Sequence, residues 1–275
     1  MLIKLIGLVM IECDGAPNRH LSSAQAQVAF ARLTLERASG TNRDQLADTV
    51  WPGKLPDTWS SALRSVVSRV RAFVSHPEPT HEPPLVAQGG RYLLRLPTDT
   101  TVDLEFAEEA IGKANQAFAA GALAEAQRLA TTATASLQGP FLPDHDSEWV
   151  NSIRERVEAS LVSGLETASL AASGLGDERN ALRFADEAVR RAPLRESAHR
   201  CRMTAHAAAG NRAQALWSYH ELRRTLAEEL GIEPAPETQK AFLQLLRSPE
   251  EEPWPEARRD SERVLLPCSR CGAVA

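Results

Sequence analysis

Several features that would place this chain in a specialised class are missing from its 275 residues. The opening stretch MLIKLIGLVMI is about eleven residues long and contains Lys4, and no later stretch approaches the roughly 18 apolar residues of a membrane span. No cleavage site of small residues follows it, so a secretory signal peptide is not expected. We therefore expect a cytoplasmic protein without membrane contact.

Cysteine is also scarce. Four cysteines in 275 residues are too few for a disulfide framework, so reduced thiols are expected. Cys13 and Cys201 lie in strand and helix patterns and should be buried. Cys268 and Cys271 form a Cys-x-x-Cys pair, which is half of a four-ligand zinc site. Because no neighbouring Cys or His completes the ligand set, no metal is predicted.

Catalytic signatures are absent from the sequence. The Gly53-Lys54 pair is followed by Leu and lacks the preceding glycine of a phosphate-binding loop. His199 and His206 share a face of one predicted helix, but no acidic or cysteine partner completes a ligand set, which favours histidines of a core or interface. Three acidic residues beside a tryptophan favour a solvated loop over a metal site: Asp144, Asp146 and Glu148. We predict no enzyme and no cofactor.

Charge is distributed unevenly along the chain. The formal net charge of −5 argues against a protein that coats nucleic acid non-specifically. Residues 1–97, however, contain 11 basic and 8 acidic side chains, whereas residues 98–275 contain 20 basic and 28 acidic ones. A basic front and an acidic back point to two parts with different partners.

The first part, residues 1–97, mixes strand and helix patterns. Residues 2–13 cluster Leu, Ile, Val and Met before Asp14-Gly15, a hairpin-turn signal, so short strands are expected. Three capped helices should follow, from Ser22 or Ser23 to about Ala38, from Thr41 or Asn42 to Trp51, and from Trp59 to about Val74. LVAQGGRYLLRL then predicts a hairpin around Gly89-Gly90. This order of elements is that of a winged helix-turn-helix.

The predicted third helix tests whether this part binds DNA. Five residues form one apolar stripe for the core: Leu63, Val66, Val67, Val70 and Val74. The opposite face has small side chains at its centre and arginines on its flanks: Ser61, Ser65, Ser68 and Ala72, with Arg64, Arg69 and Arg71. Small side chains let a helix enter a major groove, and guanidiniums can reach phosphates or guanine edges. An ordinary solvated helix is the alternative, and Arg91 after the Gly-Gly turn favours DNA.

The second part, from about residue 101 to 248, has a helical period throughout. Two similar strings, which start at Gly176 and Gly210, lie 34 residues apart, the period of tetratricopeptide repeats, and a looser copy starts at Gly121. We expect the glycine and alanine positions to allow close helix packing, and stacked helix pairs to form a concave surface for a peptide or partner domain. Residues 249–275 are charged and Pro-punctuated, which predicts a disordered tail.

Two segments resemble a known family. LADTVWPGKLPDTWSSALRSVVSRVRAFV (46–74) and, in the second part, the run from Ala192 through Gly210 and Tyr219 to LAEELGIEP are similar to motifs of the Streptomyces antibiotic regulatory protein family of transcriptional activators. LQGPFLPD (137–144) resembles the loop that interrupts that family's bacterial transcriptional activator domain. The similarity extends over residues 3–246. The predicted fold class is therefore an α+β winged helix-turn-helix domain at 1–97, followed by an all-α tetratricopeptide-like repeat domain at 101–248.

The resemblance implies an OmpR-type winged helix that binds direct repeats upstream of promoters as two adjacent protomers. It also implies a helical domain that helps to recruit RNA polymerase. The family's recognition-helix positions fall on five residues of this chain: Arg64, Ser65, Ser68, Arg69 and Arg71. Together with Arg91 they are the predicted contacts to double-stranded DNA, although Arg69 could instead pair with an acidic neighbour and orient the helix.

Two alternatives to a DNA-binding activator stay open. The first is a tetratricopeptide scaffold whose winged helix has lost tight DNA binding. It is favoured by departures such as Ala72, where the family often has a second basic residue. The second is a regulator that senses a small molecule in the helical domain, and the sequence indicates no polar pocket to support it.

Overall fold

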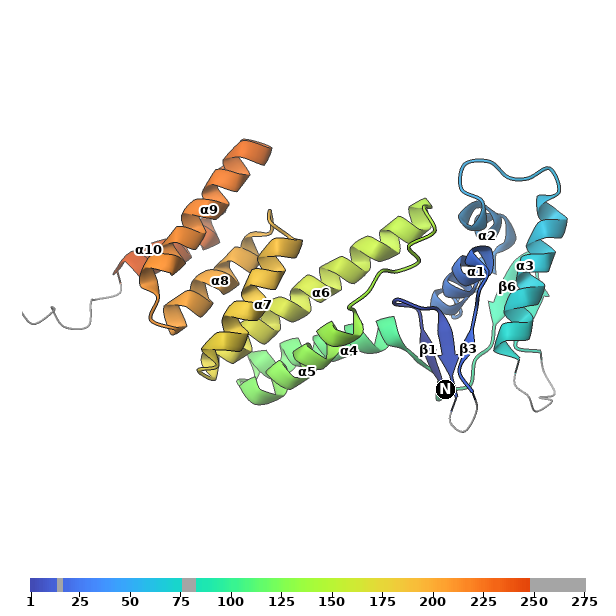
Figure 1. Ribbon diagram of the computed structural model, residues 1–275, viewed down its shortest axis with the longest axis horizontal. Helices are drawn as coiled ribbons and strands as arrows, with labels where there is room; N and C mark the ends of the chain where they lie inside the picture. The colour runs from blue at the N-terminus through green and yellow to red at the C-terminus, as the bar shows by residue number, and fades with distance from the viewer. Residues whose placement is uncertain (14–16, 76–82, 248–275) are drawn as a thin grey trace, which may run out of the picture.

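The structure is a computed structural model that describes residues 1–13, 17–75 and 83–247. Within these residues the chain is mostly helical, with small sheets gathered near its N-terminus (Figure 1). The sheets and the first three helices form an N-terminal unit. The later helices form a helical unit that extends away from it, which makes the molecule elongated (Figure 1).

The larger sheet consists of four short strands in the order β3-β2-β1-β7. They are β1 (Leu2–Lys4), β2 (Met10–Glu12), β3 (Arg19–His20) and β7 (Thr101–Val102). β1 pairs antiparallel with β2, with Ile3 opposite Ile11, and parallel with β7. Both isoleucines are fully buried, since alternate residues of a strand face the same side. The strands predicted within residues 2–13 are confirmed, and Asp14-Gly15 lie outside the described residues.

Three helices follow the predicted pattern, but Ser23 before α1 and Thr58 before α3 make no side-chain cap hydrogen bond. They are α1 (Ala24–Leu35), α2 (Arg43–Val50) and α3 (Trp59–Val74). α1 ends before the predicted limit near Ala38, because the backbone turns over residues 36–39. Asn42 caps α2, since its side chain accepts hydrogen bonds from the backbone N–H groups of Asp44 and Gln45. The bounds of α3 agree with the prediction.

The predicted hairpin is present after α3. β5 (Leu85–Gln88) and β6 (Arg91–Leu94) pair antiparallel, and Gly89 and Gly90 form the turn between them. β6 also pairs with β4 (Thr41–Asn42), which directly precedes α2. The hairpin is therefore attached to the start of α2 and is not a free loop.

Seven helices make up the helical unit within the described residues. They are α4 (Asp103–Ala119), α5 (Leu123–Ser136), α6 (Glu148–Gly174), α7 (Glu178–Arg191), α8 (Glu196–Ala208), α9 (Arg212–Leu230) and α10 (Pro236–Arg247). Each helix packs against the next one along the chain, as a helical repeat array requires (Figure 1). The helical pattern predicted for this part is confirmed.

The repeated glycines and alanines have different roles. Gly176 lies between α6 and α7 with a φ of 75°, and Gly210 lies between α8 and α9 with a φ of 72°. A Cβ at either position would meet nothing within 4 Å. The expectation that these glycines allow close packing is wrong: they allow a left-handed turn that other residues rarely adopt. Ala181 and Ala215 are fully buried in the helix interfaces, so that expectation is confirmed for the alanines.

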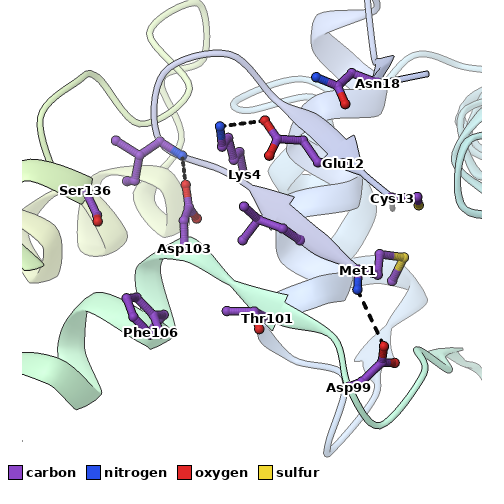
Figure 2. Close-up of a pocket in the computed structure, with 12 residues that line it drawn as sticks. Met1, Lys4, Glu12, Cys13, Asn18, Asp99, Thr101, Asp103, Phe106 and Ser136 are labelled. Atoms are coloured by element: carbon purple, nitrogen blue, oxygen red, sulfur yellow. Dashed lines mark hydrogen bonds and ion pairs between the residues drawn. The ribbon is translucent and has the colours of Figure 1, made fainter. Parts of the chain in front are cut away.

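Contacts of α4 join the two units. Asp103, the first residue of α4, accepts hydrogen bonds from the backbone N–H groups of Leu5 and Ile6 at 3.0 Å, and Figure 2 shows the bond from Ile6. Burial raises the pKa of its carboxyl group, and these N–H groups oppose that rise. Arg37, in the turn that follows α1, donates two hydrogen bonds to the Glu105 carboxylate, at 2.5 and 2.7 Å. One hydrophobic core also runs through both units.

The loop between α5 and α6 adds a second junction. The N–H of Gly7 donates to the carbonyl of Pro140 at 2.9 Å, and a ring nitrogen of His145 lies 2.7 Å from the carbonyl oxygen of Ala24. Arg154 on α6 holds this loop by donating to three of its carbonyl groups: those of Phe141, Leu142 and His145. The junctions at α4 and at this loop set the orientation of the helical unit relative to the N-terminal unit.

Candidate nucleic-acid interface

The buried side of α3 is the one that its periodicity predicts. All five residues of the predicted apolar stripe are buried: Leu63, Val66, Val67, Val70 and Val74. Phe73 is buried with them, and its ring packs edge-on against Phe30 of α1, with 5.1 Å between ring centres. This packing fixes which side of α3 faces solvent.

The exposed side of α3 carries the five side chains predicted to contact DNA. Arg64, Ser65, Ser68, Arg69 and Arg71 are all exposed. The Ser65 hydroxyl donates to the Ser61 carbonyl within the helix. Because Ser65 and Ser68 have short side chains, the centre of this surface is recessed between the longer arginine side chains. Such a surface can approach a groove of DNA closely while the guanidiniums reach its edges.

A hollow of about 500 Å³ lies between α3 and the hairpin. Its lining includes Arg64 and Arg71 of α3, Arg91 of the hairpin, and Arg43 at the start of α2. We call it the arginine hollow. Among the described residues no acidic side chain lines it, so it presents a positive surface that suits an anion such as a phosphate. The structure thus brings together three of the four predicted arginines.

The arginines of the hollow differ in how firmly they are held. Arg71 donates from Nε to the Leu85 carbonyl at 3.1 Å, and Arg91 donates from Nη1 to the Gly40 carbonyl at 3.0 Å. Arg64 makes no hydrogen bond or ion pair with another described residue, so its guanidinium is available. Arg71 and Arg91 are oriented by the backbone of the N-terminal unit and retain further N–H donors.

Arg69 lies outside the arginine hollow. Its guanidinium donates from Nη1 to the hydroxyl of Ser23 at 3.3 Å, on the other flank of α3. The partner is a hydroxyl at the start of α1 rather than the acidic neighbour that the sequence left open. Arg69 therefore orients α3 against α1 and stays exposed enough to meet a ligand.

Arg43 is the residue of this surface that the sequence analysis missed. Its guanidinium lies 5.0 Å from the centre of the Trp59 ring and lines the arginine hollow. One signal was available: Arg43 stands in the first turn of α2, where a cation opposes the helix dipole. A residue that is unfavourable for its own helix indicates a role in its surroundings.

A second hollow, lined mostly by the N-terminal unit, has little preference for charge. It occupies about 1040 Å³ beside β1, β7 and α4 (Figure 2). Lys4 pairs with Glu12 at 2.6 Å, and the Met1 amino group lies 3.6 Å from Asp99 (Figure 2). Its opposite charges thus neutralise one another, unlike those of the arginine hollow.

The helical unit has a polar hollow that the sequence did not indicate. It measures about 480 Å³ and lies between α5 and α7. Arg190 and Arg191, which line it, both pair with Glu187, which also lines it. Because its own acidic side chain neutralises these arginines, this hollow is less suited to an anion than the arginine hollow.

The histidines and acidic residues noted in the sequence do not assemble into a metal centre in the described part of the chain. His199 is buried, and its Nε2 lies 2.9 Å from the Pro193 carbonyl oxygen. His206 is half-buried, and Asp144, Asp146 and Glu148 are exposed. Cys201 is buried and Cys13 is half-buried, whereas Cys268 and Cys271 lie outside the described residues. Among the described helices, none is long and apolar enough to cross a membrane.

Comparison with known proteins gives a family match for the helical unit. A family model described as the bacterial transcriptional activator domain matches residues 102–246. The chain is 27% identical to the regulatory protein AfsR of Streptomyces griseus over 83% of this chain and 23% of AfsR. It is 26% identical to the regulatory protein DnrI of Streptomyces peucetius over 90% of this chain and 93% of DnrI.

EmbR, a transcriptional regulatory protein of Mycobacterium tuberculosis H37Rv, is similar in both sequence and fold. It is 28% identical over 88% of this chain and 62% of EmbR. A structure of EmbR in complex with a low affinity phosphopeptide superposes with a TM-score of 0.80 at 23% identity, and the match covers 89% of this chain and 64% of that chain. The chain thus spans about a quarter of AfsR and under two thirds of EmbR. The likeness to the EmbR structure shows a shared fold.

Proposed function

Because this chain belongs to the bacterial transcriptional activator domain family and is a transcription regulator of the Streptomyces antibiotic regulatory protein type, we propose that it binds specific DNA sequences. Residues 1–97, which make up the N-terminal unit apart from β7, act as a winged helix-turn-helix, with α3 as the recognition helix and the β5–β6 hairpin as the wing. Its helical unit, residues 101–248, acts as a tetratricopeptide-like domain that contacts RNA polymerase. Two protomers bind adjacent direct repeats near a promoter.

The arginine hollow is the observation that carries the proposal. Arg64, Arg71 and Arg91 converge there from the recognition helix and the wing, and no acidic side chain of the described part of the chain lines the space between them. The DNA backbone presents closely spaced phosphates, and guanidiniums bind them with two N–H donors each. The exposed Ser65 and Ser68 leave α3 slim enough to reach base edges in a major groove.

The modest charge of the N-terminal unit supports binding as a pair. With 11 basic and 8 acidic side chains in residues 1–97, one protomer provides few phosphate contacts. Each contact releases counterions, so affinity and its salt dependence both grow with the number of contacts. Two protomers on adjacent repeats double the number of contacts. Contact between the protomers also raises the effective concentration of the second one at its repeat.

The proposal is tested by electrophoretic mobility shift on the DNA upstream of the chain's own gene, over a series of salt concentrations. The wild type should retard a fragment that contains direct repeats. Arg64→Ala and Arg71→Ala should each weaken binding and reduce the slope of log affinity against log salt by about one unit, as expected for one lost phosphate contact. Arg224→Ala, on the exposed side of α9, is the matched control and should bind as the wild type does.

A scaffold that binds no DNA is the competing function. If no fragment is retarded even at low salt, and the double variant Arg64→Ala with Arg71→Ala behaves as the wild type does, the DNA-binding proposal is rejected. Scrambling one of the two repeats separates paired from single binding, because paired protomers should then lose affinity for the intact repeat as well.

A further inference from the structure

Arg43 joins three elements of the N-terminal unit at one point. Its backbone N–H donates to the carbonyl of Gly90 in the hairpin turn at 3.0 Å. Its guanidinium stacks on Trp59, 5.0 Å from the ring centre, and donates from Nη2 to the Ser60 hydroxyl. Since Arg43 is the first residue of α2 and Trp59 the first of α3, the hairpin turn and the starts of both helices meet here.

This placement does not serve the stability of α2. A cation in the first turn of a helix is unfavourable beside the positive end of the helix dipole. The Nε of Arg43 is also buried without a hydrogen-bond partner in the described part of the chain, which costs free energy. The contacts of the guanidinium with Trp59 and Ser60 therefore provide the reason for an arginine at this position.

The two sides of the arginine hollow belong to different elements. Arg64 and Arg71 project from α3, whereas Arg91 follows the hairpin turn. A ligand that contacts both sides needs them at a fixed separation, because binding groups must be held close to their productive geometry. Arg43 contacts both sides: the hairpin through its backbone and α3 through its side chain.

We propose that Arg43 is a positioning residue that sets the separation of the hairpin from α3, and with it the fit of the arginine hollow to DNA. This inference rests on the proposed function. The planar guanidinium is essential to the role, because it stacks on an aromatic face while its edge donates hydrogen bonds. A lysine keeps the charge but cannot stack in this way.

The role is tested with Arg43→Lys, Arg43→Ala and Trp59→Leu on the full chain. Each should lower the affinity for the repeat-containing fragment about tenfold, an effect comparable to one mismatched base pair. Affinity for random-sequence DNA should change less than about twofold, and the salt slope should stay at the wild-type value, since no phosphate contact is lost. Combining Arg43→Ala with Arg91→Ala should cost less than the product of the two single effects, because both act through the hairpin.

Two DNA results would overturn the inference. Wild-type affinity in Arg43→Lys would show that charge alone matters at this position. If the slope of log affinity against log salt falls by about one unit in Arg43→Ala, Arg43 contacts a phosphate directly. Arg224→Ala again controls for the loss of one positive charge.

A measurement without DNA separates this inference from the proposed function. Hydrogen exchange of the free protein should be faster at residues 88–91 in Arg43→Lys than in the wild type, and unchanged in α6 and α7. Equal exchange in the hairpin of both proteins overturns the positioning role. If the wild type retards no DNA, the proposed function is rejected. The exchange experiment still decides whether Arg43 positions the hairpin.

Discussion

At the scale of single residues, Cys201 shows how strongly the fold alters side-chain chemistry. Its side chain is buried between α8 and α6, with Sγ 3.9 Å from the Glu166 carbonyl oxygen. Burial, together with the negative charge of Glu166, raises the pKa of the thiol to about 12. Since the thiolate is the nucleophile, Cys201 is inert at neutral pH.

We therefore expect iodoacetamide at pH 8 to leave Cys201 unmodified in the native protein. Peptide mass spectrometry after a timed reaction provides the measurement. The same treatment in denaturing guanidinium is the control and should modify Cys201 fully. Modification of the native protein at the rate of the denatured one would show that the thiol is accessible, contrary to its burial.

The residues that we propose to face DNA were predictable only in part. Helical periodicity was sufficient to identify Arg64 and Arg71 as exposed, because which side of a helix faces the core follows from local spacing. It could not show that Arg91 turns back to the Gly40 carbonyl, or that Arg69 bonds to Ser23. Those orientations depend on groups that only the folded chain brings near.

At the scale of elements, α8 carries two histidines that fold in the neutral form. His199 donates from Nε2 to the Pro193 carbonyl, which leaves Nδ1 facing the Arg202 guanidinium at 3.4 Å. Burial lowers the pKa of His199 and Arg202 lowers it further, whereas the hydrogen bond to the Pro193 carbonyl and the charge of Glu221 oppose this shift. Burial also lowers the pKa of His206, with Asp186 opposing.

These shifts predict acid destabilisation. A base whose pKa is lower in the folded state stabilises the fold above its unfolded pKa, near 6.5 for histidine, and this stability is lost as pH falls below that value. The free energy of unfolding by urea should therefore fall between pH 7.5 and pH 5.5. His199→Gln, whose amide can still donate to Pro193, should flatten this dependence more than His206→Gln, because His206 is only half-buried. An unchanged dependence in His199→Gln would assign the acid sensitivity to other groups.

At the scale of the whole molecule, Arg154 holds the loop that joins the two units. It donates to three loop carbonyls, and a lost hydrogen bond to a charged group costs about 1.5–3 kcal/mol. Arg154→Ala should therefore lower the melting temperature by several degrees, at about 2–4 °C per kcal/mol for a chain of this size. Differential scanning calorimetry gives the shift and shows whether one transition splits into two.

Arg156→Ala is the matched control for this prediction, two residues further along α6. Arg156 pairs with Glu108 on a half-exposed surface, and such pairs contribute about 0–1 kcal/mol. Equal shifts of the melting temperature in the two variants would mean that the loop contacts of Arg154 stabilise the protein no more than an exposed ion pair does. A single transition in the wild type is expected, because one hydrophobic core runs through both units.

The sequence by itself determined the order of the three helices in the N-terminal unit, the buried stripe of α3, the hairpin at Gly89-Gly90 and the family resemblance. Each depends on residues within a few turns or strands of one another. Tertiary structure alone decided that Asp103 binds the N–H of Leu5 across 98 positions, and that Arg43 meets both Trp59 and Gly90. Local spacing sets which side of an element is apolar, but tertiary packing decides which other elements lie beside it. The arginine hollow depends on both, since its four arginines lie on three segments, α2, α3 and the hairpin, that only the folded core brings together.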